Sequence, residues 1–525
     1  MSSKINGCRR GVALPVARHN RHKIGLRDAL AAMSMSGGVA KNLAREGLPG
    51  RWRGQAAMRL GLVGMASDED IAAVMDEGII VRPDPDGGPP IEQPLRGAKA
   101  EIGFYGVILA LPKSVSLLLT STDAGEREAA EAAIQAASAA YLATLEQTVR
   151  TRIGADGATS IAGSGLAAVE FFHHGSSAGD PHVHVHLMIA NSTEGSDGRW
   201  RTIDSKLLFA AQRIATAAAM RAVQSTVSAA LGLGPDAWTS ALVGSVPTPE
   251  ISALRDASDI LSRASDRLWK QRKSAGIIGT PGHRLASHLW KIDRQAGRAG
   301  YERIEAGIDL VLAVGGEAAD ALRADWRALG GGALRVGFEA LRAQRGEMTP
   351  SAAAAWTPPS PTNQEIVDFI ENSEIFTLSD LAAYLVGRGI ATDKALIAAA
   401  RWLDTAADAA AVHGPGRLTE IAQALRDGRL LETRRAHALA GANARIVTDT
   451  RVRHDARIVE RLTQIARAAG RPLLVALPSS ATMEQAAAIA LAAEGRRLAM
   501  IKGVAGAGKS FILQPVTDAA RRQRM

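Results

Sequence analysis

The pattern of apolar and polar residues divides the first half of the chain into strands and helices. Residues 102–111, 166–172 and 182–191 are short runs rich in apolar and β-branched side chains, which predicts strands. Two longer, Ala-rich stretches, 126–150 and 205–232, predict helices, and a glycine closes the second. Together these segments predict an α+β fold, in which helices cover one face of an antiparallel sheet.

The second half of the chain is predicted to be mostly helical. Residues 247–345 are rich in Arg and Lys and are expected to form helices, whereas the Pro-rich stretch 350–361 has the composition of a linker. Strands at 472–476 and 497–501, with a helix between them, predict an α/β segment. The expected organisation is a basic flexible arm (1–30), a main domain (31–345), a linker (346–363), a small helical region (364–439) and the α/β segment (440–525).

One predicted strand concentrates the candidate chemistry. Five of the twelve histidines fall between His173 and His186. Alternation from position 182 places His182, His184 and His186 on one strand face, and His173 can supply a third ligand from a neighbouring strand. Imidazole suits Zn, Mn, Fe, Ni or Cu, so the pattern predicts a site where a divalent ion polarises a phosphoryl oxygen. The alternative is a histidine-rich tract that holds no ion.

Charge and cysteine content narrow the class of protein. The chain has 62 Lys and Arg against 53 Asp and Glu, a net charge of +9, which favours a polyanionic partner, nucleic acid before a membrane surface. An Arg-rich composition inherited from a GC-rich genome is the alternative explanation. The single cysteine, Cys8, excludes a disulfide framework and a Cys-based zinc site and favours the cytoplasm. The basic N-terminus lacks the apolar core of a signal peptide, and no membrane span is predicted.

A second motif lies close to the last residue. Gly503, Gly506, Gly508, Lys509 and Ser510 fit the P-loop consensus and follow a predicted strand. In such a loop, backbone N–H groups approach the phosphates, the lysine reaches the β and γ phosphates, and the hydroxyl holds Mg²⁺. The motif predicts ATP as a ligand, the alternative being a glycine-rich turn. Only fifteen residues follow it, so the segment is expected to be the truncated start of an ATPase domain.

Four blocks in this order resemble the conjugative relaxase–helicases of the MobF, or TrwC-like, family, whose relaxase domain is a HUH endonuclease. They are Gly-Arg-Trp-Arg-Gly at 50–54, Ala-Leu-Pro-Lys-Ser-Val-Ser at 110–116, Asp-Pro-His-Val-His-Val-His at 180–186, and the P-loop. The resemblance covers about residues 40–345 as relaxase and 440–525 as the beginning of a helicase.

The resemblance implies a function and a set of ligands. A relaxase binds single-stranded plasmid DNA at a transfer origin and nicks it by metal-dependent transesterification, with relaxosome proteins and the conjugative coupling protein as further partners. The implied metal ligands are His173, His184 and His186, with Mg²⁺ or Mn²⁺ as the first candidate ions and Zn²⁺ as the next. Gln485 is at the position of an adenine-contacting glutamine. Arg51, Trp52, Arg53 and Lys113 are predicted DNA contacts, with core packing as the alternative for the tryptophan.

The chain departs from the family at the nucleophile and at the base. The family attacks DNA with an N-terminal tyrosine, but the matching positions, 34–35 and 41–42, hold none, and the family's aspartate falls on Gly106. The four tyrosines of the chain are Tyr105, Tyr141, Tyr301 and Tyr384. Three explanations compete: a decayed or truncated relaxase, a wrong start or frameshift, and attack by Tyr105.

The function alternatives follow from these departures. Besides an active relaxase, the sequence allows an inactive remnant that only binds DNA, an ATP-binding helicase fragment, and a metal-dependent nuclease that uses water. Whether the chain is an enzyme therefore depends on a nucleophile that the sequence alone does not identify.

Overall fold

The described residues of the computed structural model fall into two compact units. One is formed by Met1–Phe369, Phe376–Ala409 and Gly414–Ile446, the other by Ile370–Ile375, Ala410–His413 and Val447–Met525. Within them the structure describes residues 4–10, 13, 50–82, 88–154, 159–176, 180–261, 308–309, 311–313, 315–373, 375–399, 402, 412–413, 445–467, 472–494 and 509–523.

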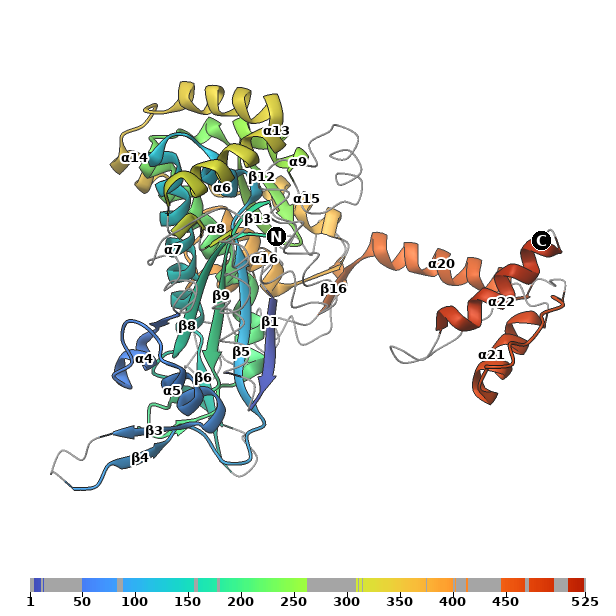
Figure 1. The fold of residues 1–525 in the computed structure, drawn as a ribbon. Helices are drawn as coiled ribbons and strands as arrows, with labels where there is room; N and C mark the ends of the chain where they lie inside the picture. Colours follow the sequence, from blue (N-terminus) through green and yellow to red (C-terminus); the bar gives the residue numbers. More distant parts are fainter. Residues whose placement is uncertain are drawn as a thin grey trace. The chain divides into compact units, whose positions relative to one another are not determined.

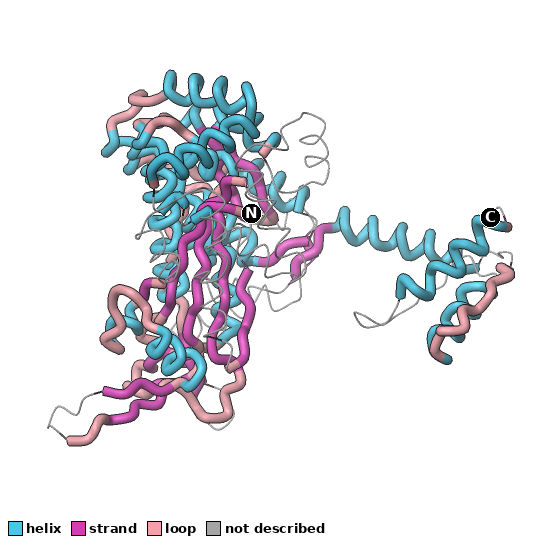
Figure 2. The backbone as a smooth tube through the Cα atoms, viewed as in Figure 1, coloured by secondary structure: helices cyan, strands magenta, loops and turns pink. Residues whose placement is uncertain are grey.

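A five-stranded antiparallel sheet forms the centre of the first unit (Figure 1). Figure 2 shows its longer strands side by side. In spatial order the strands are β1 (Lys4–Arg9), β5 (Ile102–Ala110), β9 (Pro181–Ala190), β8 (Ala168–Gly175) and β2 (Arg51–Arg53). The antiparallel sheet predicted from the sequence is confirmed, with three of its five strands near the expected positions.

Two long helices, α7 (Ala124–Glu146) and α8 (Ser205–Leu231), cover one face of this sheet (Figure 1). Each begins at an aspartate whose side chain accepts a hydrogen bond from a backbone N–H of the first turn, and α8 ends at Gly232 in the left-handed region, φ 64°. The predicted helices on one face, and with them the α+β class, are confirmed.

Among the described residues, a hydrophobic cluster covers one end of the opposite face. There the indole of Trp52 packs with Phe104, Phe171 and Met188 of the sheet and with Met75, which belongs to the turn following α5 (Asp68–Ile71). The rest of this face includes Ile108, which is 49% exposed. Ile108 is therefore the exposed part of this face in the described residues, beside the hydrophobic cluster.

The remaining elements are short or peripheral. The other helices and helical turns are α4 (Gln55–Arg59), η1 (Ala72–Glu77), α6 (Lys113–Ser116), η2 (Leu117–Thr120), η3 (Pro235–Ala237), η4 (Ser252–Leu254), α9 (Arg255–Ile260), α13 (Gly316–Gln344), α14 (Pro350–Ala355), α15 (Asn363–Ser373), α16 (Leu378–Gly387), α20 (Asp449–Arg467), α21 (Met483–Ala493) and α22 (Lys509–Arg522). The other strands are β3 (Ile79–Arg82), β4 (Ile91–Pro94), β6 (Arg150–Ile153), β7 (Thr159–Ala162), β10 (Thr193–Glu194), β11 (Trp200–Arg201), β12 (Trp238–Val243), β13 (Val246–Ile251), β14 (Ile375–Thr377), β15 (Val412–His413) and β16 (Arg445–Thr448).

The prediction of a flexible basic arm over residues 1–30 is wrong for the part that the structure describes. Residues Lys4–Arg9 form β1 and pair with β5, with Asn6 opposite Gly106, and Ile5 is buried. Basic composition suggested a solvated arm, but the edge of β5 offers hydrogen-bonding groups that a strand satisfies better than water-exposed coil does.

Three other expectations in the second half need correction. The predicted helical stretch 247–345 begins inside the hairpin of β12 and β13, and the predicted linker contains the helix α14. Residues 472–476 form no strand, while the expected strand at 497–501 lies outside the described residues. Short segments such as these are decided by tertiary partners more than by local pattern.

The region 364–439, predicted to be a separate helical part, belongs largely to the first unit. Its helix α16 packs against α8, and Asp380 of α16 accepts hydrogen bonds from Arg213 and Ser245. No helix within the described ranges is both long and apolar enough to cross a membrane.

Candidate metal centre

Strand register brings three histidines together on the partly uncovered face of the sheet. His184 of β9 lies opposite His173 of β8, and His186 is two residues further along the same face. One ligand atom from each of the three lies within 4.8 Å of the other two. Their ring centroids are 4.7–5.1 Å apart. The geometry brings together the three residues that the sequence singled out.

The groups beside the ring nitrogens of His184 and His173 favour the tautomer that binds metals through Nε2. The Nδ1 atom of His184 is 2.9 Å from the backbone carbonyl of His182, and Nδ1 of His173 is 3.3 Å from Oδ2 of Asp309. Because a carbonyl can only accept, Nδ1 of His184 carries the proton and Nε2 carries the lone pair. The negative charge of Asp309 beside Nδ1 of His173 favours the same tautomer in that ring. A set of three imidazoles fits Mn²⁺, Zn²⁺ or Cu²⁺ better than Mg²⁺, which prefers oxygen ligands.

The strand that carries two of the ligands is anchored at its start by Lys113. This side chain is only 10% exposed, donates to the carboxylate of Asp180 and donates to the carbonyl of Pro181 at 2.6 Å. Burial would raise the pKa of the Asp180 carboxyl, but the charge of Lys113 and the hydrogen bonds outweigh it and hold the pKa below its usual value of 3.8. Lys113 is therefore held inside the fold by Asp180 and Pro181, and its role as a DNA contact stays a prediction.

The Pro-Lys-Ser-Val-Ser segment at 112–116 also binds the backbone of β9 and of β13. The hydroxyl of Ser116 accepts a hydrogen bond from the backbone N–H of Val183 in β9 at 3.1 Å, and that of Ser114 accepts one from Ile251 in β13 at 3.0 Å. Both serines are fully buried. The motif that resembles the family thus fixes the position of the histidine strand.

The other predicted DNA contacts do not gather around the histidines. Trp52 is 4% exposed and lies in the hydrophobic cluster, so it offers no ring for base stacking, and the alternative of core packing holds. Arg51 and Arg53 lie in register with Glu170 and Ala168, on the face of the sheet opposite the histidines. Arg53 is paired with the buried carboxylate of Glu170, whereas Arg51 is exposed.

Tyr105 is on the wrong face to attack a substrate held by the histidines. It lies opposite Ile189 of β9, and its neighbour Gly106 is on the histidine face, so the side chain of Tyr105 points to the helices. There it packs edge-on against Phe209 of α8, and its hydroxyl is 3.3 Å from Oδ1 of Asn191. Burial raises the pKa of the phenol, which disfavours the phenolate. The hypothesis of attack by Tyr105 is not compatible with this geometry.

The other tyrosines that the structure describes, Tyr141 and Tyr384, are also buried. Tyr301 and residues 34–42 lie outside the described residues. Gly106, in contrast, is on the histidine face, and a Cβ added there would meet only Sγ of Cys8, at 3.8 Å. The backbone therefore has room for the side chain that the family places at this position.

A carboxylate that the sequence analysis missed lies behind the histidines. Asp309 is fully buried, and its Oδ1 accepts from the backbone N–H of His174 and lies 3.0 Å from the Nδ1 of that ring. Burial lowers the pKa of His174, but the hydrogen bonds to Asp309 and to Glu131 outweigh this effect and raise it to about 10. No local motif marks Asp309, because it reaches the histidines only through the tertiary fold.

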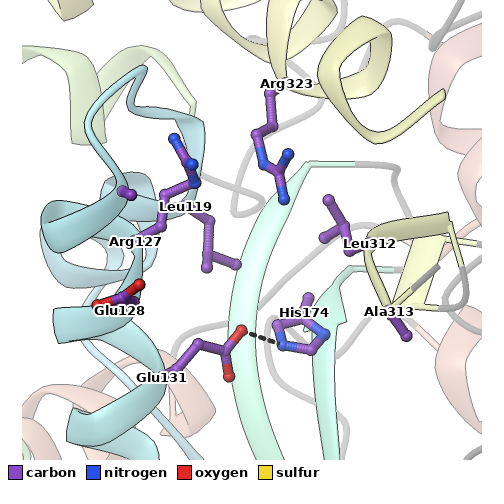
Figure 3. A pocket seen from close by; sticks show the side chains of 9 residues that line it. Leu119, Arg127, Glu128, Glu131, His174, Leu312, Ala313 and Arg323 are labelled. Atoms are coloured by element: carbon purple, nitrogen blue, oxygen red, sulfur yellow. Dashed lines mark ion pairs between the residues drawn. The ribbon is translucent and has the colours of Figure 1, made fainter. Parts of the chain in front are cut away.

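Figure 3 shows the far side of this cluster, where Glu131 points from α7 toward His174. The two groups line a cavity of about 230 Å³ together with Arg127 and Arg323. Since His173 and His174 are consecutive residues of a strand, the cavity and the three-histidine cluster lie on opposite faces of the sheet.

The P-loop lies almost entirely outside the described residues. Gly503, Gly506 and Gly508 are not described, and Lys509 and Ser510 begin helix α22. Gln485 has a local role, since its Oε1 accepts from the backbone N–H of Thr482 in the capping box of α21. The predicted ATP site therefore stays a prediction.

The sheet and its cluster define an α+β protein with a candidate metal centre of three imidazoles. Residues 40–278 match the family model described as TrwC relaxase, and this part of the chain is similar to that family. The match contains all three histidines and ends well before the P-loop.

Individual relatives are of the same kind. The multifunctional conjugation protein TraI of Escherichia coli is 31% identical over 156 residues, which cover 30% of this chain and 8% of the relative. Among solved structures, the conjugative relaxase TrwC in complex with oriT DNA, in a copper-bound form, is 19% identical, with a TM-score of 0.39 over 64% of this chain and 99% of that one. TrwC complexed with a 27-mer DNA comprising the recognition hairpin and the cleavage site is 19% identical, with a TM-score of 0.37 over 59% and 98%.

Proposed function

We propose that the chain acts as a conjugative relaxase that binds single-stranded DNA at a plasmid transfer origin, with a divalent ion held by His173, His184 and His186. The observation that carries the proposal is the convergence of these three side chains inside the segment that matches the TrwC relaxase family. The DNA-bound state of the TrwC structures supports the choice of substrate.

The chemistry at this face follows from the groups present. A bound ion would act as a Lewis acid that polarises a phosphoryl oxygen of the DNA. The residues of the chain do the positioning: the β8–β9 pair fixes the spacing of the three rings, and Lys113 holds the start of β9. The half-exposed Ile108 beside His186 leaves this part of the face open to a substrate.

The proposal also depends on the group that would attack the DNA phosphate. Among the residues that the structure describes, no tyrosine reaches the histidine face, and this observation favours a second candidate function, a DNA-binding protein that keeps the metal but does not form a covalent adduct. A metal-dependent nuclease that activates water is the third, because the same ion lowers the pKa of a bound water molecule.

We extend the proposal to ATP and to protein partners on sequence grounds alone. Gly503, Gly506, Gly508, Lys509 and Ser510 would cradle the phosphates, and the relaxosome proteins and the coupling protein would be partners as in the family that the chain resembles. These parts of the proposal concern the second unit and do not depend on the metal centre.

The test uses labelled single-stranded DNA from the cognate transfer origin, the full chain and Mn²⁺. We expect a DNA complex in native gels, weakened by salt because phosphate contacts dominate, and metal binding that falls more than about 100-fold in His184→Ala, since a ligand is lost. The matched control is His182→Ala, on the same strand face but outside the three-residue cluster.

Denaturing gels then separate the candidate functions. A labelled band at protein size that disappears in His184→Ala supports an active relaxase, and cleaved ends without an adduct support a nuclease. A native complex without either product supports the DNA-binding protein. Equal metal affinity in His184→Ala and His182→Ala would refute the metal centre.

A further inference from the structure

Asp309 connects the histidine cluster to the opposite face of the sheet. One carboxylate oxygen, Oδ2, lies 3.3 Å from Nδ1 of His173, and the other, Oδ1, receives the backbone N–H of His174 and lies 3.0 Å from its ring. Both Asp309 and His173 have no exposed surface. The buried carboxylate of Asp309 therefore has three groups around it: Nδ1 of His173, the backbone N–H of His174 and Nδ1 of His174.

We propose that Asp309 is a positioning residue of the metal centre, which fixes His173 in the tautomer and orientation that a metal ion requires. The proposal rests on the function proposed above, because it concerns the same ion. It goes further in assigning a role to a residue outside the segment that matches the relaxase family.

The physical reason lies in the acceptor character of a carboxylate. With the negative charge of Asp309 3.3 Å from Nδ1, the tautomer with its N–H at Nδ1 is favoured, and the lone pair is then on Nε2. The negative charge also makes the ring a stronger electron donor to a cation, as metal-bound imidazoles with a carboxylate neighbour generally show. Both effects raise metal affinity without a direct bond between Asp309 and the ion.

The second histidine holds the carboxylate in place. His174 binds Asp309 on one side of its ring and Glu131 on the other, as the dashed line in Figure 3 marks. The chain of contacts therefore runs from Glu131 in α7 through His174 and Asp309 to His173. In this series the helix-covered face supports the geometry of the metal-binding face.

The packing of the neighbouring residue offers an independent way to disturb Asp309. A Cβ added at Gly175 would lie 2.8 Å from Cδ1 and 3.0 Å from Cβ of Ile308, the residue that precedes Asp309. Gly175→Ala should therefore displace residues 308 and 309 while leaving every polar group of the series chemically intact.

The first experiment compares Mn²⁺ affinity of the metal-free full chain, by isothermal titration, in the wild type and in Asp309→Asn. The asparagine keeps the size of the side chain. Its carbonyl can still accept from the backbone N–H of His174, and its NH₂ then faces His173, which moves the ring proton to Nε2. We expect Mn²⁺ binding to weaken about 10- to 100-fold.

The matched control is Asp320→Asn, the same change at an exposed carboxylate of α13 that pairs with Arg323. It should stay within about twofold of the wild type. Gly175→Ala should give a smaller loss than Asp309→Asn, and it keeps the proposal testable if the asparagine variant does not fold.

A purely structural role is excluded by a second readout. Nitrogen-15 NMR of the imidazole rings, with His173→Gln used to assign the signal, should show Nε2 of His173 unprotonated in the wild type and protonated in Asp309→Asn. The readout is taken from variants that keep the wild-type circular dichroism spectrum, because a neutral histidine in an unfolded chain also carries its proton mainly on Nε2.

The outcomes separate the two proposals. Wild-type affinity in Asp309→Asn, with an unchanged His173 tautomer, would overturn the role of Asp309 and leave the metal centre standing. A wild-type chain that takes up no divalent ion would overturn both.

Discussion

The two faces of the five-stranded sheet hold their polar groups in different ways. On the face covered by helices, the carboxylate of Glu170 is 2% exposed, and its oxygens accept from Arg53 and from Ser138 of α7. On the other face, His184 and His186 direct ring nitrogens toward His173 across a strand pair. On the covered face, the polar side chains are thus paired with other groups of the protein. On the histidine face, ring nitrogens of three side chains converge, an arrangement that suits a cation.

The largest effect is expected where the histidine strand begins. Lys113→Met removes the partner of Asp180, which is 1% exposed, and a buried charge without its partner typically costs about 3–5 kcal/mol of unfolding free energy. Arg53→Met on the covered face should cost less, because Arg53 is half exposed and Glu170 keeps Ser138. Urea unfolding at pH 7 measures both.

The pH dependence of stability tests the Lys113–Asp180 pair independently. The pKa of Asp180 is lower in the folded chain than the ordinary 3.8, so the pair stabilises the fold above about pH 4, and this contribution is lost as the pH falls further. In Lys113→Met, burial of Asp180 is opposed only by the hydrogen bond from Ser176 and by His182, so the stability of this variant should rise as the pH falls toward 4. A double variant, Lys113→Met with Asp180→Asn, should recover part of the loss. An equal loss in Lys113→Met and in the double variant would refute the pairing.

A smaller effect on stability is expected from Tyr105→Phe. This variant also tests whether the helix-covered face takes part in catalysis. Tyr105→Phe removes a hydrogen bond of 3.3 Å to Asn191 and should cost about 1 kcal/mol. Any protein–DNA adduct should form at the wild-type rate, as in the control Tyr141→Phe. Loss of the adduct in Tyr105→Phe alone would restore the tyrosine as a nucleophile.

The smallest effect is expected from a possible further metal ligand added to the histidine face. Gly106→Asp adds a carboxylate one same-face position from His186, in space that only Cys8 approaches. We expect Mn²⁺ affinity to rise a few fold, because a carboxylate is a favoured oxygen ligand. Gly106→Asn is the control of equal size, and the idea fails if both variants bind Mn²⁺ like the wild type.

Periodicity was sufficient to predict most of the histidine site. Residues two apart on a strand must share a face, so His184 and His186 were fixed as neighbours once 182–191 was predicted as a strand. His173 was expected on a neighbouring strand, and the register of the strand pair places it opposite His184. The antiparallel sheet and its two covering helices followed from the same kind of pattern.

The parts that could not be predicted depend on contacts between distant segments. Composition made Lys113 a candidate for DNA, and only the fold shows that a buried carboxylate stands beside it. The strand at Lys4–Arg9 is decided by the edge it pairs with, and Asp309 lies in a segment with no motif. Trp52 shows the same limit, since an indole looks alike in sequence whether it is core or surface.

The β8–β9 pair has a consequence for the order in which the chain assembles. All three candidate ligands belong to one hairpin, whose closure costs little entropy, whereas β1 must find β5 and Asp309 must find His173 over long separations. An isolated hairpin is marginal in water, so an ion that bridges its two strands would stabilise it early. Metal uptake would then begin as a nucleation event and tighten when Asp309 arrives, and refolding should accelerate with Mn²⁺ in the wild type but not in His184→Ala.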